Sequence, residues 1–210
     1  MTDTRALARE ERAEFATFLA TLSPEQWEAS TLCAGWRVRD VVAHVIGHDV
    51  QGMTGFTRTL VRSGFSPDRA NQRAVDDLGD LDPWGLLALV RRYETPEGFT
   101  ARFGCRIALC DGAIHQQDIR RPLGLPREIP PERLRAILDF AMVAPPIRAF
   151  IRTRGLRLVA TDLDWSSGRG PEVHGRGEAL LMAAAGRPVA PDELEGPGRD
   201  TLTGRIGPSR

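Results

Sequence analysis

The chain has 210 residues, enough to bury a substantial core in one domain, or in one domain with a small appendage. Its 28 basic and 28 acidic residues cancel, so it lacks the overall positive charge that draws proteins to nucleic acid or anionic membranes. All 28 basic residues are arginine, and the absence of lysine excludes Schiff-base chemistry, including a lysine-anchored pyridoxal cofactor. We attribute the arginine-only composition to a high-GC genome.

The cysteines and the N-terminal segment indicate the compartment. The three cysteines form no Cys-x-x-Cys pair, which argues against a disulfide scaffold and an all-thiolate zinc site. The N-terminal segment is charged from its start and has no apolar signal core, and no apolar stretch is long enough to span a membrane. We therefore expect a cytoplasmic protein with neither a membrane nor a nucleic-acid partner.

The first part of the chain has helical periodicity. Apolar residues at three-four spacing predict an amphipathic helix over residues 3–22. Ser23 and Gln26 form a capping box for a short helix. A second long helix is predicted from residue 37 to the low 60s, on the stripe Val38, Val41, Val42 and Val45. Glycine in a helix costs about 1 kcal/mol relative to alanine, so we expect either a kink or a close neighbour at Gly47, Gly52 and Gly55.

Further elements follow in order. Residues 64–82 are polar and predicted to be irregular, with a helical turn or two around residues 70–78. A helix begins with Asp82 as its N-cap. The next two helices are predicted from the apolar stripes Phe103, Ile107, Cys110 and Ile114, and Leu134, Ile137, Leu138, Ala141 and Met142.

The periodicity changes after Gly155 to that of short strands, followed by a short helix that ends at Gly186. The pattern predicts a helical domain over residues 1–152 and a small α/β domain over residues 153–210.

Few residues could carry chemistry. His44 and His48 share one face of the second long helix, and Asp111, His115 and Asp118 share one side of a later helix. If these two helices are neighbours, a set of two imidazoles and one carboxylate converges. Such a set suits a catalytic zinc-type site that keeps one position open. The three converging residues would be His44, Asp111 and His115.

Plainer interpretations remain open on spacing alone. The Asp–His pair could be an ordinary hydrogen-bonded pair on a helix, and His44 a satisfied interface histidine. His48 could face solvent or bond to Asp49, and His174 is assigned no role. Cys110 lies on an apolar stripe and is interpreted as a buried structural thiol. The sequence contains no Gly-x-Ser-x-Gly elbow and no phosphate-binding glycine motif, and the catalytic residues themselves stay unassigned.

Three segments together resemble the mycothiol-dependent maleylpyruvate isomerase family, which belongs to the DinB-like metal-binding four-helix bundles. "TLCAGWRVRDVVAHVIGH" (31–48) is similar to its first signature, and "RIALCDGAIHQQDIRRPLGLP" (106–126) is similar to its second. Residues 155–198 resemble the small C-terminal domain found in many members. The resemblance implies a mainly α fold: a DinB-like up-down four-helix bundle followed by a small α/β C-terminal domain.

The resemblance also implies a set of site residues. The family's metal ligands fall on His44, Asp111 and His115. His48 would be an additional ligand or a group that supports one, and Asp118 would orient a ligand or pair with Arg121. Trp36 and Arg106 are pocket-lining candidates, although Trp36 also suits a structural role. This sequence has Asp111 where the isomerase has a longer Glu, so the metal position would shift and the substrate is not specified.

The resemblance implies a cofactor and a chemistry as well. A divalent metal, with zinc favoured over nickel, manganese or iron, would bind mycothiol as a thiolate at neutral pH. Mycothiol is a thiol of high-GC actinobacteria, in agreement with the arginine-rich composition. The expected activity is that of a transferase or isomerase acting on a small electrophilic substrate. Two alternatives remain: a metal-dependent hydrolase that uses bound hydroxide, and a non-catalytic metal-stabilised binding protein. The sequence also allows a homodimer.

Overall fold

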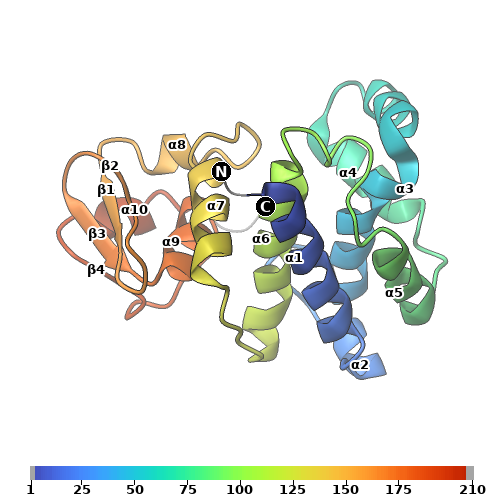
Figure 1. Ribbon diagram of the computed structural model, residues 1–210, viewed down its shortest axis with the longest axis horizontal. Coiled ribbons are helices and arrows are strands. Elements are labelled where there is room, and N and C mark those ends of the chain that lie inside the picture. Colours follow the sequence, from blue (N-terminus) through green and yellow to red (C-terminus); the bar gives the residue numbers. More distant parts are fainter. Residues whose placement is uncertain (1–2, 207–210) are drawn as a thin grey trace. The chain divides into compact units, whose positions relative to one another are not determined.

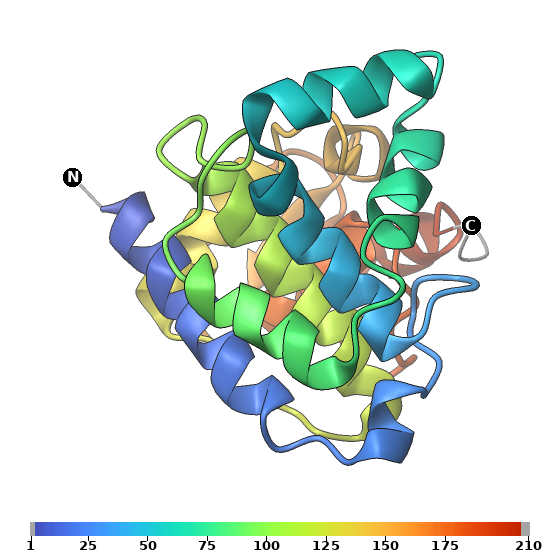
Figure 2. The same ribbon diagram turned by 90° about the vertical axis from the view of Figure 1, so that its right-hand side faces the viewer.

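The computed structural model describes residues 3–206 and divides into two compact units, one ending at Leu125 and the other beginning at Pro126. The helices of the first unit are shown from blue to green in Figures 1 and 2. Their bounds are α1 Thr4–Leu19, α2 Pro24–Trp27, α3 Val38–Arg62, α4 Pro67–Asp76, α5 Pro83–Arg92 and α6 Arg106–Leu123.

Four of these helices form a bundle. α6 packs against α1 and α3, and α5 packs against the same two helices, so every bundle helix has two neighbours. The core between them is filled by large apolar side chains that are almost completely buried, including Phe15, Leu19, Ile46, Leu86 and Leu87. The predicted fold class is confirmed: a mainly helical chain with a four-helix bundle followed by a small α/β unit.

Local sequence signals set several helix ends. Ser23 and Gln26 form the predicted capping box of α2, and the Asp82 side chain accepts a hydrogen bond from the Gly85 amide at the start of α5. The segment expected to be irregular contains α4, a longer helix than the one or two turns predicted. Its start is explained by Ser66, which caps the helix, and by Pro67 at the first helical position.

The glycines of α3 serve both purposes that the sequence suggested. Gly52 has φ 60° and ψ −170° and kinks the helix, a conformation that glycine adopts without a steric penalty. The chain around Gly98 lies against this kink, since a Cβ on Gly98 would come within 3.1 Å of the Gly52 Cα. Gly47 instead gives room to α4, because a Cβ there would lie 3.4 Å from the Ala74 side chain.

The second unit combines a small sheet with short helices. Its elements are α7 Pro131–Ala141, α8 Ala149–Arg152, β1 Arg157–Ala160, β2 Ser166–Gly168, β3 Glu172–Gly175, α9 Gly177–Ala184, β4 Leu194–Glu195 and α10 Arg199–Thr203. The strand order is β2-β1-β3-β4. β1 and β3 are parallel with Leu158 opposite Val173, and the two outer pairings are antiparallel. Leu158 and Val173 are both fully buried, and α9 packs against β1 and β3.

The division between the units lies earlier than the 152/153 boundary expected from the sequence. α7 packs against α9 and so forms part of the second unit. At this contact, a Cβ on Gly177 would lie 2.9 Å from the Leu134 side chain. Within residues 3–206, every helix is too short or too polar to cross a bilayer.

Candidate metal centre

Three potential ligands converge between α3 and α6. Nε2 of His44, on α3, is 3.9 Å from Oδ1 of Asp111, on α6. Nε2 of His115, one turn further along α6, is 3.5 Å from the same oxygen. One ligand atom from each of the three residues lies within 4.8 Å of the others. The structure therefore brings together the three residues that the sequence placed on two helices.

Burial leaves this cluster accessible on one side. His44 and His115 are buried, with 5% and 8% of their surface exposed. The Asp111 side chain is 28% exposed. The cluster therefore meets solvent at Asp111, while the two imidazoles are shielded from bulk water.

The spacing of the cluster fits a divalent metal better than direct hydrogen bonds. The two distances to Asp111, 3.5 and 3.9 Å, exceed the about 2.7–3.2 Å that is usual for a nitrogen–oxygen hydrogen bond. Ligand atoms that lie about 2.1 Å from one tetrahedral metal ion are about 3.4 Å apart. The donor set, two imidazole nitrogens and one carboxylate oxygen, is also one that zinc accepts.

The charges in the cluster are strongly coupled. Burial disfavours charge on Asp111, but the positive charge of His115 and the proximity of His44 outweigh burial and hold the pKa of Asp111 well below its usual range. Burial also opposes charge on His115, but Asp111 and Asp118 hold the pKa of His115 well above its usual range. In the metal-free protein, Asp111 and His115 thus form an ion pair. A metal ion must displace the proton of this pair to bind.

Asp118 lies on the opposite side of the His115 ring. Its Oδ2 is 2.9 Å from Nδ1 of His115, and the carboxylate is completely buried. A carboxylate only accepts hydrogen bonds, so Nδ1 keeps a proton towards Asp118 and Nε2 is the ring nitrogen that faces Asp111. When the ion pair gives up its proton at Nε2, the lone pair of that nitrogen is free to bind a metal. Carboxylate–histidine pairs of this kind fix the orientation of metal-binding imidazoles in many proteins.

Sequence reasoning missed Cys33. Its thiol donates a hydrogen bond to Oδ2 of Asp118, with a sulfur–oxygen distance of 3.1 Å. Cys33, His115 and Asp118 form a second group with metal-binding spacing, and His115 belongs to both groups. The signal was present in the "TLCAGW" signature, but Cys33 lies in a loop, where helical periodicity gives no information about position.

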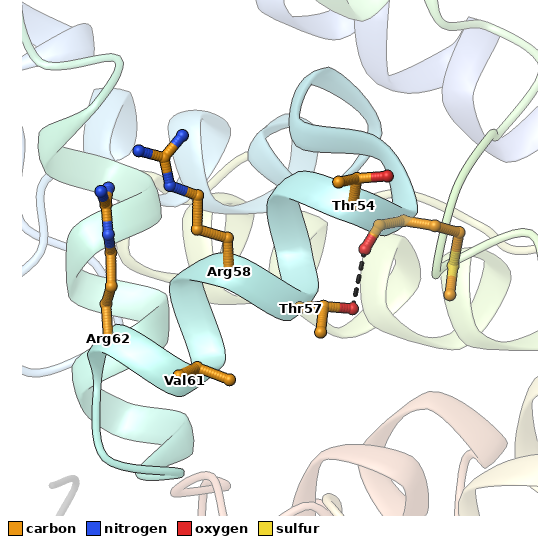
Figure 3. A pocket seen from close by; sticks show the side chains of 6 residues that line it. Thr54, Thr57, Arg58, Val61 and Arg62 are labelled. Atoms are coloured by element: carbon orange, nitrogen blue, oxygen red, sulfur yellow. Dashed lines mark hydrogen bonds between the residues drawn. The ribbon is translucent and has the colours of Figure 1, made fainter.

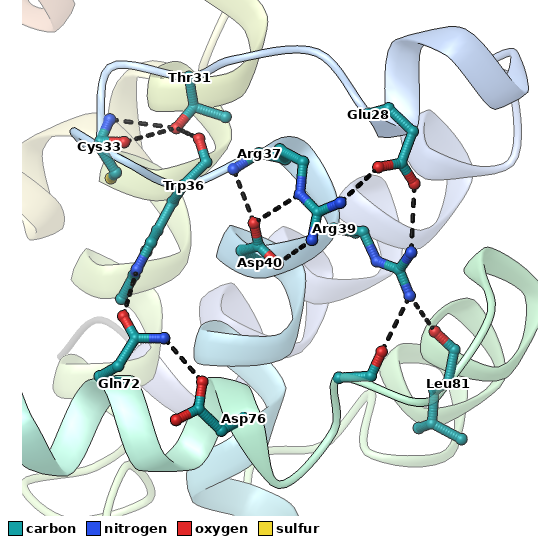
Figure 4. Close-up of polar contacts among 11 residues, drawn as sticks. Glu28, Thr31, Cys33, Trp36, Arg37, Arg39, Asp40, Gln72, Asp76 and Leu81 are labelled. Carbon is teal, nitrogen blue, oxygen red and sulfur yellow. Dashed lines mark hydrogen bonds and ion pairs between the residues drawn. The ribbon is translucent and has the colours of Figure 1, made fainter.

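Two other candidates lie beside the cluster. The Trp36 ring is 5.1 Å from the His44 ring, centroid to centroid, and its Nε1 donates to Gln72 (Figure 4). The His48 ring is 5.3 Å from the His44 ring and packs edge-on against Phe56. Both side chains therefore contribute to the wall around His44, although neither belongs to the group of three ligand atoms.

The suggested contact between His48 and Asp49 does not form. Asp49 instead pairs with Arg12 in the buried interior at 3.1 Å. Nδ1 of His48 is buried and has no hydrogen-bond partner among residues 3–206. Burial, and then the neighbouring His44, lower the pKa of His48 to about 4, so this imidazole is neutral at physiological pH.

Arg106 and His174 are not part of the cluster. Arg106 is exposed at the first residue of α6, and within residues 3–206 no hydrogen bond or ion pair joins it to the three ligands. Nε2 of His174 is paired with Glu172 at 2.9 Å on β3 of the second unit.

A shallow surface hollow of about 620 Å³ lies away from the ligands, on the part of α3 beyond the kink (Figure 3). Its lining consists of Met53, Thr54, Thr57, Arg58, Val61 and Arg62.

Comparison with known proteins finds one matching family and two solved structures with a similar fold. Residues 8–96 match the family described as mycothiol maleylpyruvate isomerase N-terminal domain. Solved structures of the mycothiol-dependent maleylpyruvate isomerase and of a histidine-to-alanine mutant of that enzyme both have a TM-score of 0.60 and 18% identity to this chain. Each alignment covers 97% of this chain and 93% of the other.

No curated protein matches the chain significantly. At 18% identity, the two solved structures establish the fold, which extends over both units. The match of residues 8–96 covers the segment that contains His44 and the "TLCAGW" loop. Through residues 8–96 the chain is therefore similar to the mycothiol maleylpyruvate isomerase N-terminal domain family.

Proposed function

We propose that this protein is a divalent-metal-dependent and mycothiol-dependent transferase or isomerase that acts on a small electrophilic substrate. The observation that supports this most is the convergence of two buried histidines, His44 and His115, with the partly exposed Asp111. The family supports mycothiol as the thiol.

His44, Asp111 and His115 would hold the metal, and zinc suits the two nitrogens and one oxygen. When bound, such a metal supplies Lewis acidity that lowers the pKa of a thiol, so that the nucleophilic thiolate is available at neutral pH. Asp111 is shorter than the glutamate that the isomerase has at this place, so the metal position would shift and we do not specify the substrate.

The chain's own residues orient and shelter the site. Asp118 accepts a hydrogen bond from Nδ1 of His115 and thereby directs Nε2 towards Asp111. The rings of Trp36 and His48 flank His44 and form part of the wall around it. Because His48 is neutral at physiological pH, it adds no positive charge that would oppose a bound cation.

The thiol would react with an electrophilic carbon of the substrate. If the new carbon–sulfur bond persists, the result is transfer of the thiol. If the thiolate adds to a carbon–carbon double bond, rotation about the resulting single bond and elimination return the free thiol and the isomerised alkene. Both outcomes use the same nucleophile, so the site residues alone do not separate them.

Metal analysis of the purified protein and two assays test this proposal. Wild-type protein should contain a stoichiometric divalent metal, and His44→Ala and His115→Ala should lose it. His174→Ala is the matched control, because that histidine is paired with Glu172 in the other unit and should leave the metal content unchanged. Wild-type protein without a metal would contradict the proposal.

The assays measure loss of mycothiol thiol and isomerisation of the substrate over a panel of electrophiles that includes maleylpyruvate. Thiol loss indicates transfer, whereas isomerisation that requires mycothiol without consuming it indicates an isomerase. Metal-dependent turnover that does not require mycothiol would contradict the proposal and indicate a hydrolase. A stoichiometric metal without any turnover would favour a binding protein.

A further inference from the structure

Cys33 and His115 share one acceptor on the protected side of the imidazole. The Cys33 thiol donates to Oδ2 of Asp118 at 3.1 Å, and Nδ1 of His115 is 2.9 Å from the same oxygen. The Cys33 sulfur also lies 3.7 Å from Nδ1 of His115. A single buried carboxylate oxygen therefore accepts hydrogen bonds from both the thiol and the imidazole.

The loop around Cys33 is built to hold the thiol at this place. The backbone amide of Leu32 donates to the backbone carbonyl of Asp118 at 3.0 Å, which ties the loop to α6. The Thr31 hydroxyl accepts a hydrogen bond from the Cys33 amide at 3.1 Å and donates to the Trp36 carbonyl at 2.9 Å (Figure 4). Cys33 is thus fixed by backbone contacts on both sides.

We propose that Cys33 is a positioning residue for the metal centre: through Asp118, its thiol holds the His115 ring with Nε2 directed at Asp111 and His44. This inference rests on the proposed metal-dependent function. The thiol is a second donor to the buried carboxylate oxygen that holds His115, and it covers the Asp118–His115 hydrogen bond. Without the thiol, water enters beside Asp118 and the imidazole is held less firmly.

Cys105 is a buried cysteine that, unlike Cys33, does not contact Asp118. Cys105 is completely buried at the N-terminal end of α6, six residues before Asp111. Replacing Cys105 removes a buried sulfur at the N-cap of α6, the helix that carries Asp118, and leaves the contacts of Asp118 in place. It therefore serves as the matched control for a general loss of packing.

The first test measures the dissociation constant for zinc by competition with a chromophoric chelator. Cys33→Ala should bind zinc about 3- to 10-fold more weakly than wild type, because it loses one hydrogen bond one step removed from the ligand. Cys33→Ser keeps a donor and should recover most of the affinity, and Cys105→Ala should match wild type. Equal zinc affinity of Cys33→Ala and wild type would overturn the inference, as would equal weakening in Cys33→Ser and Cys33→Ala.

The second test uses the metal-free protein and so separates this inference from the proposed function. In wild type and Cys33→Ser, the Nδ1 proton of His115 should exchange slowly with water and give an observable NMR resonance. In Cys33→Ala this proton should exchange faster. Unchanged exchange in Cys33→Ala would contradict the positioning role, whatever the zinc result. If wild type binds no zinc but the exchange differs as expected, the metal-dependent function fails while the positioning of His115 stands.

Discussion

The two sides of the His115 ring differ in spacing and in access to solvent. On the Nδ1 side, one oxygen of the fully buried Asp118 carboxylate lies 2.9 Å from Nδ1 of His115 and 3.1 Å from the Cys33 sulfur. On the Nε2 side, Asp111 is 3.5 Å away and partly exposed. The first side is closed by protein contacts, and the second has the spacing of ligands around a metal. The difference indicates that the contacts at Nδ1 orient the His115 ring so that Nε2 can bind a metal.

The largest effect should come from removing the ring itself. His115→Ala deletes both sides at once and should weaken zinc binding by more than about 100-fold, beyond the effect usual for an outer partner. Isothermal titration of the metal-free protein with zinc would measure this. Zinc affinity within a few-fold of wild type would show that the Nε2 side is not a metal ligand.

Asp118→Asn tests the closed side alone. It keeps the shape of the side chain but removes the negative charge that holds the Nδ1 proton, so zinc affinity should fall about 10- to 100-fold. The same titration, together with circular dichroism to verify folding, would check this. If a folded Asp118→Asn variant binds zinc as tightly as wild type, the hydrogen bond at Nδ1 does not support metal binding at Nε2.

His48 gives a pH-dependent prediction for the metal-free protein. The unfolded chain protonates this imidazole near its ordinary pKa of about 6.5. Burial, and then the neighbouring His44, lower the pKa of the folded state to about 4. The stabilisation is therefore fully present above pH about 6.5 and is lost as the pH falls towards 4, by up to about 3 kcal/mol.

Urea denaturation between pH 4 and 7 measures this change, and His48→Gln should lose that part of the pH dependence. The raised pKa of His115 has the opposite effect on the pH dependence of stability, and its effect lies at higher pH. Its stabilisation is complete below about 6.5 and declines as the pH rises through the folded-state value. Identical pH profiles for wild type and His48→Gln would show that His48 is not desolvated as the structure indicates.

Trp36→Phe should have the smallest effect. The change removes the hydrogen bond from Nε1 to Gln72 but keeps an aromatic ring beside His44. We expect a loss of about 1 kcal/mol or less in the free energy of unfolding and an unchanged zinc affinity, measured by urea denaturation and titration. A strong loss of zinc affinity would assign Trp36 a direct role at the centre.

The sequence predicted the convergence at the centre but not all of its contacts. His44 on one helix and Asp111 with His115 on another follow from helical spacing, and the resemblance paired the two helices. Cys33 was missed because a loop has no periodicity from which its neighbours can be inferred. Its partner Asp118 is distant in sequence, and only the packing of the loop on α6 brings them together.

The boundary between the two units could not be predicted from the sequence for a different reason. The apolar stripe of α7 predicted a helix correctly, but an apolar stripe does not identify the element that covers it. In the structure that element is α9, which lies later in the chain and belongs to the second unit. Capping signals such as Ser23 and Asp82 were reliable because they act within a few residues.

X-ray absorption at the zinc edge of the zinc-loaded wild-type protein, without added thiol, tests the central claim most directly. We predict nitrogen and oxygen neighbours at about 2.0–2.1 Å, including imidazole scattering, and no sulfur. A zinc–sulfur distance of about 2.3 Å would place the metal with Cys33 on the Nδ1 side of His115 and would contradict the account.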